Sequence, residues 1–486
     1  MANGWITDTL ILLPLGGAIF IALAPLPRLA AGLIALAVSL VEIAFWGGAL
    51  SAFDYAPNQP FVQLQDTTTW FGELGISYHV GFAGFGLWLV GLASVAMTAA
   101  IAYATWVRRE RARAYFASML LLTAALVGVF AAQDYLLFYV FWEAMLIPLY
   151  VLVGVWGGPG RLRATLLFFI YTMAGSLLML ASIIVLGISH GSFDMLAPTA
   201  YSNSDWIFLG FVAAFLVKAP LFPFHGWLPD AYREAPAEVA GVLSGVVSKA
   251  AAYGFLYVAI VHFPQPTHDF RTPILVLAAT GLIYGSLLAF RAPDIRGVVA
   301  YSSLAQMGLI TIGLFATNIA GFNGAVLQMV NHGLISATMF MLAGLVELRT
   351  GTGRFDRLGG MARGRPALAT VLMTLGVIAL AVPGSGAFAG EFLILTGVFP
   401  TGWGWSVVGA IAIVLAAMYI LRLISAVLHR SKGTAVEPTA RDLRLPELVF
   451  LVPLVVCLIF LSAWPAAITD HTFGQTSQTP GLALLR

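Results

Sequence analysis

Long apolar runs constrain the fold of this chain more than any other feature. A helix needs about 20 apolar residues to cross a hydrocarbon core about 30 Å thick. Runs near this length predict about fourteen spans, at 8–25, 30–50, 80–105, 115–132, 135–155, 164–188, 206–226, 238–262, 273–290, 298–316, 322–347, 367–399, 404–428 and 446–465. A membrane barrel would show short segments of alternating polarity instead. Only 9% of the residues are charged, against about 25% in soluble domains. We therefore predict an all-α polytopic membrane protein.

The basic residues divide the predicted loops into two alternating sets. One set holds almost every loop arginine, whereas the other holds only Arg271 and Arg486. Because basic loops stay on the cytoplasmic side, the first set predicts the cytoplasmic face. Both termini are then expected on the external (periplasmic) side of the inner or plasma membrane, as an even number of spans requires. The acidic loop 51–79 has no lysine or arginine and is predicted to be external.

Two spans are interrupted by proline and glycine at membrane depth. Pro220 and Pro223 follow Lys218 in the motif KAPLFPF, and the motif VPGSGAFAGEF at 382–392 interrupts the span 367–399. Each proline lacks an N–H and frees a carbonyl. Transporters use such broken helices at ion sites that line hydrated cavities. The loop charges make the first broken span run inward and the second outward, which predicts two inverted five-helix repeats.

This symmetry suggests a division of the chain into four parts. They are three N-terminal helices with the external loop (1–113), a first repeat of helices four to eight (114–262), a second repeat of helices nine to thirteen (273–429), and a last helix with an external tail (430–486).

Two of the only three lysines lie where a cation is most costly. Lys218 is about 18 Å along its helix from Trp206, and Lys249 is about 16 Å along its helix from Glu238. Both ammonium groups therefore fall near the bilayer centre. A charge survives there only if it faces a polar interior, so both lysines are predicted to be functional.

Two carboxylates and one histidine join these lysines as candidates. Glu143 lies roughly 13 Å into the span 135–155, and Glu391 directly follows the second break. His332 can serve as a proton relay because histidine titrates near neutrality; a structural core histidine is the alternative. Glu143 can likewise be a neutral, hydrogen-bonded acid. Glu42 stands in the second span with no lysine in view, and its role stays open.

A Glu–Lys pair can by itself switch a proton. A carboxylate about 4 Å from a buried lysine contributes roughly 4 kcal/mol at an effective dielectric constant near 20, enough to decide whether the lysine keeps its proton. No cofactor is required for such a switch. Cys457 is the only cysteine, which excludes a cysteine-ligated iron–sulfur cluster held by this chain. No residue spacing indicates a metal or nucleic-acid site.

Six motifs carry a resemblance to a known family. They are FWEAMLIPLY (141–150), VKAPLFPFHGWLPDAYREAP (217–236), SKAAAYG (248–254), AYSSLAQMG (300–308), NHGLISATMFMLAG (331–344) and VPGSGAFAGEF (382–392). With these motifs the sequence resembles the antiporter-like membrane subunits of the proton-pumping NADH:quinone oxidoreductase, respiratory complex I. The similarity is greatest to subunit M, which is subunit 4 in mitochondria.

The resemblance implies a function and a set of site residues. Glu143, Lys218, Lys249 and Glu391 match the proton-pathway residues of the family, and His332 lies on its central polar axis. It implies a translocase subunit without a redox centre or cofactor, assembled with antiporter-like subunits of the L and N types. Two positions depart from many relatives: Gln306 replaces histidine and Arg296 replaces lysine. Because an amide does not exchange a proton easily, water is expected to carry the proton past Gln306.

Three alternatives stay open on the sequence. The first is the D-type membrane component of a multisubunit cation/proton antiporter, and the second is a membrane subunit of a membrane-bound hydrogenase. The third is a scaffold without transport, which the buried charges disfavour. The motif EAP at 234–236 and Glu391 favour the respiratory complex.

Overall fold

The computed structural model describes residues 3–56, 59–197, 204–437 and 440–473. Its first half contains α1 (Gly4–Leu23), α2 (Arg28–Ala52), β1 (Val62–Phe71), η1 (Gly72–Leu74), β2 (Ile76–Ala83), α3 (Gly84–Val107), α4 (Ala112–Ala131), α5 (Tyr135–Ala144), α6 (Leu146–Trp156), α7 (Arg161–His190), α8 (Asp205–Lys218), α9 (Leu228–Glu234), α10 (Ala237–Val242), η2 (Leu243–Val247), α11 (Ser248–Tyr253) and η3 (Gly254–Ile260). Its second half contains α12 (Pro264–Arg291), α13 (Ile295–Leu314), α14 (Ile319–Thr350), α15 (Pro366–Ala379), α16 (Gly386–Val398), η4 (Phe399–Thr401), α17 (Trp403–Ile424), η5 (Ser425–His429), α18 (Leu445–Ala463) and α19 (Ala466–Thr469).

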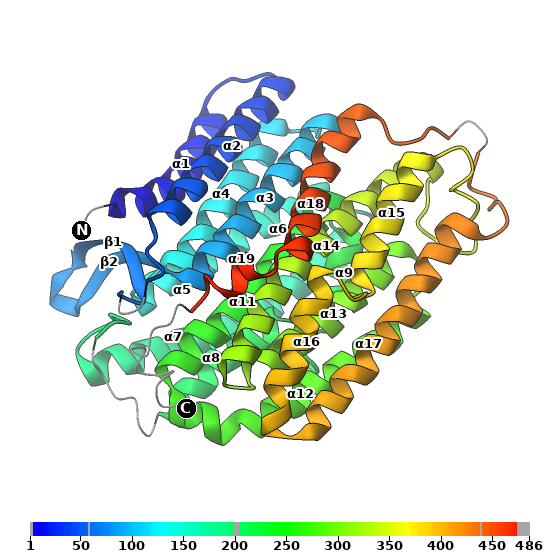
Figure 1. Cartoon of the computed structure of the whole chain (residues 1–486). Coiled ribbons are helices and arrows are strands. Elements are labelled where there is room, and N and C mark those ends of the chain that lie inside the picture. Colours follow the sequence, from blue (N-terminus) through cyan, green and yellow to red (C-terminus); the bar gives the residue numbers. More distant parts are fainter. Residues whose placement is uncertain (1–2, 57–58, 198–203, 438–439, 474–486) are drawn as a thin grey trace.

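The helices lie side by side in one bundle (Figure 1). In the described residues, 12 helical segments are long and apolar enough to cross a membrane. The chain is therefore a multi-pass membrane protein. The two other predicted spans contain shorter helices. The span 206–226 contains α8 and a non-helical segment after Lys218, and the span 367–399 contains α15 and α16 separated by a break. The count of fourteen spans and the inverted repeats stay predictions.

The first break follows Lys218, where α8 ends. The carbonyl of Leu216, freed by Pro220, accepts a hydrogen bond of 3.0 Å from the Leu221 amide. The next carbonyl, of Val217, accepts one of 3.0 Å from the Trp227 indole. Such partners explain why an unwound segment is tolerated at this depth, because an unpaired carbonyl in hydrocarbon would cost several kcal/mol.

The second break separates α15 from α16. Residues 380–385 are not helical, and α16 begins at Gly386, inside the motif 382–392, so that Glu391 lies in the helix after the break. Ala381 and Gly384 have φ values of 51° and 97°. The Ser385 hydroxyl then caps α16 by accepting a 3.2 Å hydrogen bond from the Phe388 amide. This cap fixes the start of α16 at Gly386.

The bundle is helical as predicted, but the structure adds a pair of strands to it. The loop expected at 51–79 contains most of an antiparallel hairpin of β1 and β2, in which Val62 pairs with Ala83 and Thr68 with Tyr78. The third span consequently begins at Gly84, since residues 80–83 belong to β2. The threonine-rich β1 fits the β-propensity of branched side chains. Our prediction wrongly assigned the last apolar residues of β2 to the following helix.

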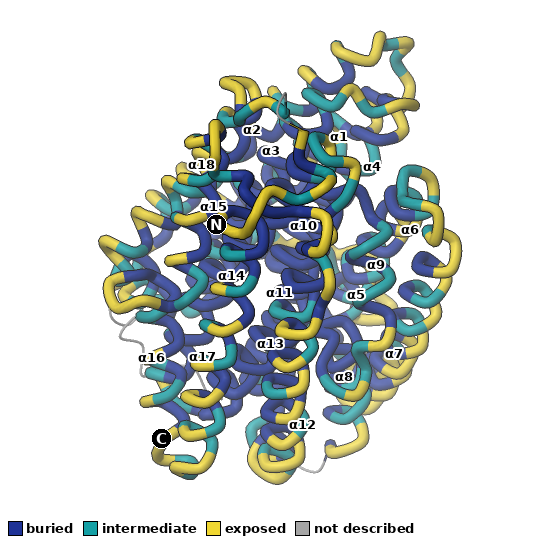
Figure 2. Tube along the Cα trace, turned by 90° about the vertical axis from the view of Figure 1, so that its right-hand side faces the viewer, coloured by how far each residue is buried: buried dark blue, intermediate teal, exposed yellow. Residues whose placement is uncertain are grey.

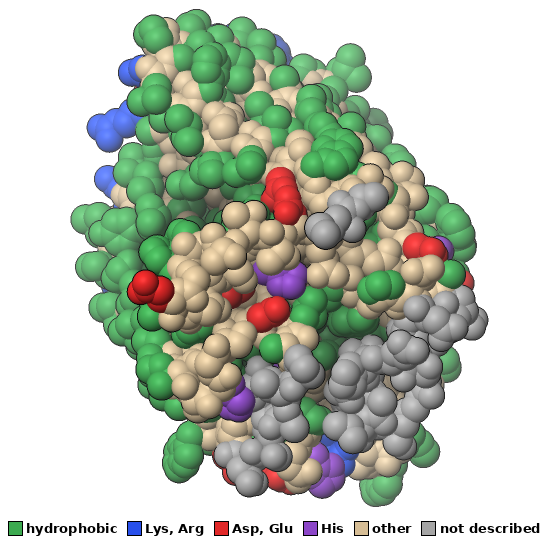
Figure 3. All heavy atoms as spheres, turned by 90° about the vertical axis from the view of Figure 1, so that its left-hand side faces the viewer, with side chains coloured by type: hydrophobic (Ala, Val, Ile, Leu, Met, Phe, Trp, Pro, Cys, Tyr) green, Lys and Arg blue, Asp and Glu red, His purple; other side chains and the backbone are tan. Residues whose placement is uncertain are grey.

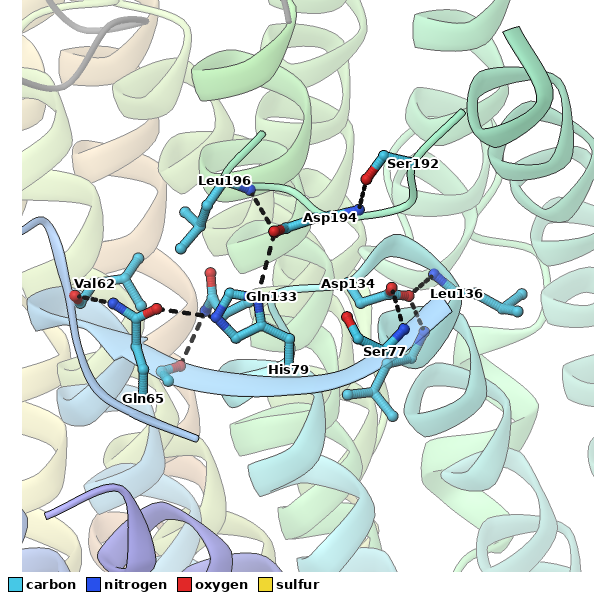
Figure 4. A network of polar contacts seen from close by, with 12 residues as sticks. Val62, Gln65, Ser77, His79, Gln133, Asp134, Leu136, Ser192, Asp194 and Leu196 are labelled. Atoms are coloured by element: carbon cyan, nitrogen blue, oxygen red, sulfur yellow. Dashed lines mark hydrogen bonds and ion pairs between the residues drawn. The ribbon is translucent and has the colours of Figure 1, made fainter. Parts of the chain in front are cut away.

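Polar contacts hold this hairpin onto the bundle (Figure 4). The buried His79 ring has its Nε2 2.9 Å from Gln65 Oε1 and its Nδ1 3.3 Å from Asp194 Oδ1. Burial opposes ionisation of Asp194, but hydrogen bonds from His79 and the Leu196 amide lower its pKa. Asp134 caps the start of α5 by accepting hydrogen bonds from the Leu136 and Leu137 amides, and it also accepts one from the Ser77 amide of the hairpin.

The interior of the bundle is formed by the α10–η3 segment and by α14. In both segments, every residue of the most apolar stretch is buried. In α2, only 28% of the residues in the corresponding stretch are buried. Figure 2 shows buried stretches through the interior and exposed ones on outer helices such as α12 and α17. The two interior segments carry the candidate residues Lys249 and His332, which are therefore kept from lipid by the surrounding helices.

Candidate functional site

Lys249 lies in a short α-helical turn between two π-helical segments, η2 and η3. In η2 the Ser248 amide donates to the Leu243 carbonyl. The Ser244 carbonyl instead accepts hydrogen bonds from the Lys249 ammonium, at 2.7 Å, and from the Ser248 hydroxyl, at 2.8 Å. π-Helical turns are rare and are frequent at functional sites. Here the widened turn provides an acceptor for an ammonium group that is fully buried.

A close approach of two helices brings Lys249 to His332. A Cβ atom on Gly245 would lie 2.7 Å from the Gly333 carbonyl oxygen, and one on Gly333 would lie 2.7 Å from the Gly245 oxygen. Small residues at such positions let membrane helices pack closely. Lys249 Nζ is 2.7 Å from His332 Nδ1 as a result. The structure therefore places His332 in direct contact with the central lysine.

Hydroxyl groups surround this contact. Ser244 Oγ donates to Ser303 Oγ at 2.9 Å and also hydrogen-bonds Ser336 Oγ. Sequence reasoning missed these serines and also Gln328. A periodic signal was available, because Gln328, His332 and Ser336 are spaced by four residues and so share one face of α14.

Glu391 lies across a cavity from His332. The cavity measures about 30 Å³ and is lined by His332, Ser336, Gln306, Gln328 and Glu391, together with apolar residues that include Ala387. This exceeds the roughly 10–15 Å³ that one water requires. Its polar walls can therefore hold a short chain of water between the histidine and the carboxylate.

Two glutamines hold the Glu391 carboxylate in place. Gln306 Nε2 donates to Glu391 Oε1 at 3.0 Å, and Gln328 Nε2 donates to Gln306 Oε1 at 2.8 Å. Glu391 Oε2 is buried and has no hydrogen-bond partner within the described residues. The glutamines orient the acid, and the cavity borders the same carboxylate.

Lys218 and Glu143 are neighbours without a direct contact. The Lys218 ammonium donates a 3.1 Å hydrogen bond to the Trp142 carbonyl and lies 4.2 Å from the centre of the Trp142 ring. Glu143 is the next residue but, among the described residues, forms no ion pair with Lys218, and its side chain is only partly buried. The direct Glu–Lys contact used in our energetic argument is thus wrong for Lys218. It is also wrong for Lys249, which contacts a histidine.

Glu42, the remaining candidate, and His225 lie away from this axis. Glu42 is buried between α2 and α3, where the Ser94 hydroxyl lies 3.3 Å from its Oε1 and no basic group pairs with it in the described part of the chain. His225 stacks on Phe222 at a ring separation of 5.8 Å. No group of three or more histidine, cysteine or acidic residues in the described ranges could hold a metal ion.

Comparison with known families identifies the part of the chain that runs from α5 into α17. The family model described as "NADH:quinone oxidoreductase/Mrp antiporter, TM" matches residues 132–417, which is more than half of the chain. The chain belongs to this family. The match contains both breaks and all five candidate residues.

Curated members of the NADH:quinone oxidoreductase/Mrp antiporter family are similar over most of their length. The NADH-quinone oxidoreductase subunit M of Rickettsia prowazekii (strain Madrid E) is 33% identical over 431 residues, covering 87% of each chain. The NADH-ubiquinone oxidoreductase chain 4 of Arabidopsis thaliana is 33% identical over 471 residues, covering 95% of each.

Two solved structures share the fold of this chain. A chain of respiratory complex I from Thermus thermophilus with bound NADH superposes with a TM-score of 0.87 at 27% identity, over 99% of this chain and 98% of that one. A chain of the Mrp complex from Dietzia sp. DQ12-45-1b has a TM-score of 0.83 at 18% identity and matches over only 54% of its own length. The latter likeness concerns the fold alone.

Proposed function

We propose that this chain is a proton-translocating membrane subunit of an NADH:quinone oxidoreductase. The observation that carries the proposal is the buried axis from Lys249 through His332 and the polar cavity to Glu391. All four parts lie inside the bundle, and the redox chemistry that drives the transfer takes place in other subunits. The resemblance to subunit M and chain 4 relatives supports this assignment.

The geometry suggests an order of transfer. Lys249 can pass a proton to His332 across the 2.7 Å contact between Nζ and Nδ1. The imidazole then releases a proton into the cavity, where water carries it past Gln306 to Glu391. Lys218, buried beside Trp142, holds a second charge in the first half of the chain. A change in the charge of Glu143 acts on Lys218 through space, which provides a way to couple the two halves.

The assembly and orientation follow from the same assignment. We infer that the subunit packs beside antiporter-like subunits of the L and N types. It would lie in the cell membrane with both termini on the external side. The four-part division at 1–113, 114–262, 273–429 and 430–486 remains part of this proposal. It is supported by the positions of the two breaks, after Lys218 and before Gly386.

A cation/proton antiporter subunit is the second candidate, because the Mrp chain has the same fold. The two differ in their partners and in their driving force. Purification of the chain from native membranes should recover NADH:quinone oxidoreductase subunits. Recovery of antiporter subunits without NADH-oxidising components would favour the second candidate.

Lys249 is the residue that tests the mechanism. Lys249→Ala should abolish proton pumping in the reconstituted complex while the complex still assembles. Lys249→Arg should also fail, because arginine keeps its charge and does not release a proton in proteins. Lys432, which lies outside the bundle interior, provides the matched control Lys432→Ala. Full pumping by an assembled Lys249→Ala complex would refute the role of this lysine.

A further inference from the structure

A large pocket lies away from the proton axis, where the end of α1 meets the starts of α2 and α4. It measures about 520 Å³, more than ten times the roughly 30 Å³ that a water molecule occupies in the liquid. Its lining consists of three arginines and four small or apolar residues: Ala22, Leu26, Arg28, Arg111, Ala112, Arg113 and Ala114. Two segments more than 80 positions apart in sequence thus bring three positive charges to one pocket.

These three arginines differ from several other arginines of the predicted cytoplasmic face, which pair with carboxylates. Arg109, Arg296 and Arg349 each form a bidentate pair with a buried or partly buried glutamate. Arg28, Arg111 and Arg113 form no ion pair with any carboxylate in the described residues, and Glu110 beside them does not line the pocket. One of the three is nevertheless oriented, because Arg113 Nη1 donates a 3.2 Å hydrogen bond to the Ala24 carbonyl.

The surface next to the pocket is apolar and faces outward. Leu23 is 78% exposed, and Ile19, Phe20, Leu29 and Leu33 are all more than half exposed. Of the candidate spanning helices in the described chain, α2 has the smallest share of buried residues in its most apolar stretch, at 28%. Figure 3 shows most of the visible Lys and Arg side chains along one edge of the molecule, beside hydrophobic side chains. A positive pocket therefore adjoins a face that hydrocarbon covers.

We propose that this pocket binds the phosphate headgroup of an anionic phospholipid whose acyl chains lie along α1 and α2. Basic pockets between membrane helices on the cytoplasmic side are typical binding sites for such headgroups. Guanidinium groups suit phosphate because they donate paired hydrogen bonds in a planar fork. A free phosphate ion would satisfy the arginines equally well, but it would leave the adjoining exposed apolar side chains of α1 and α2 without a role.

The test measures lipid retained by the intact complex. The complex is reconstituted in nanodiscs of phosphatidylcholine with or without phosphatidylglycerol, and the phosphatidylglycerol bound to this subunit is measured by native mass spectrometry. Arg28→Gln and Arg111→Asn should each weaken retention about fivefold, and together about 25-fold. Asparagine is chosen because Arg111 has a φ of 49°, a region that asparagine tolerates. Arg28→Lys should retain most of the lipid because it keeps the charge.

Two further variants separate a built pocket from general surface charge. Arg291→Gln removes an exposed arginine from the same face without touching the pocket and should leave retention unchanged. Ala114→Phe keeps all three charges but places a bulky ring in the pocket, and it should reduce retention. Equal losses in Arg291→Gln and Arg28→Gln, or unchanged retention in Ala114→Phe, would overturn the proposal.

A competition experiment distinguishes the two sources of phosphate. Inorganic phosphate is added to the phosphatidylglycerol nanodiscs at the same concentration as the phosphatidylglycerol. At this concentration it should not displace the lipid. Displacement at such concentrations would identify a free anion as the ligand and overturn the lipid assignment. This readout does not depend on pumping, so it can fail or succeed independently of the proposed function.

Discussion

Filling the cavity between His332 and Glu391 should stop proton transfer without removing any titratable group. Ala387 is 2% exposed and lines this cavity. Ala387→Leu adds three carbon atoms to a space of about 30 Å³, which holds only about two waters at 10–15 Å³ each. The leucine should therefore exclude the water that the glutamines cannot replace.

The size of the expected fall in the proton-transfer rate follows from the polar atoms that lose their water. Glu391 Oε2 and Gln328 Oε1 are both buried and receive no hydrogen bond from the described residues. A buried polar group left without a partner costs about 1–3 kcal/mol. If one such cost of about 2 kcal/mol is added to the transfer barrier, the rate falls roughly 30-fold. Overpacking adds about 1–3 kcal/mol of destabilisation, so assembly has to be verified.

The assay compares proton pumping with electron transfer in proteoliposomes. The assembled Ala387→Leu complex should lose most of its pumping through this subunit, whereas Ala387→Ser should pump normally because it keeps the space and adds a hydroxyl. Unimpaired pumping by Ala387→Leu, with the leucine shown to occupy the cavity, would refute transfer through water at this point.

Three more changes test other parts of the chain. In a double-mutant cycle, Glu143→Gln and Lys218→Met should be coupled in pumping by more than about 0.5 kcal/mol, and additive losses would show that the two act separately. Glu391→Gln should reduce pumping most when a membrane potential is present, because the potential contributes about 2.3 kcal/mol per charge per 100 mV to outward release; an equal loss with the potential collapsed would indicate a structural role. Arg109→Gln should destabilise the protein by about 3–5 kcal/mol, since it leaves the fully buried Glu238 with a single hydroxyl donor. An unchanged melting temperature would contradict that last expectation.

The buried charges were predictable because membranes make them costly. Lys218, Lys249 and Glu391 stand out in apolar runs, and the structure buries all three. The break after Lys218 was also predictable, since proline removes a backbone donor wherever it lies. The hairpin of β1 and β2 was missed because β2 is a short apolar segment next to a longer one. Length and composition alone do not show where the strand ends and the helix begins.

The contacts between the candidate residues depend on packing that a single sequence does not display. Membrane depth follows from counting residues along a helix, so the sequence determined that Lys249 and Glu391 lie inside the bundle. The partner of Lys249 is His332 rather than a carboxylate, because Gly245 and Gly333 allow two helices distant in sequence to touch. The water-sized cavity likewise exists only where side chains from α13, α14, α15, α16 and α17 fail to fill the space between them. A sequence lists the groups that can carry a proton, but only the tertiary structure decides which of them come within about 3 Å of one another, the range of a hydrogen bond.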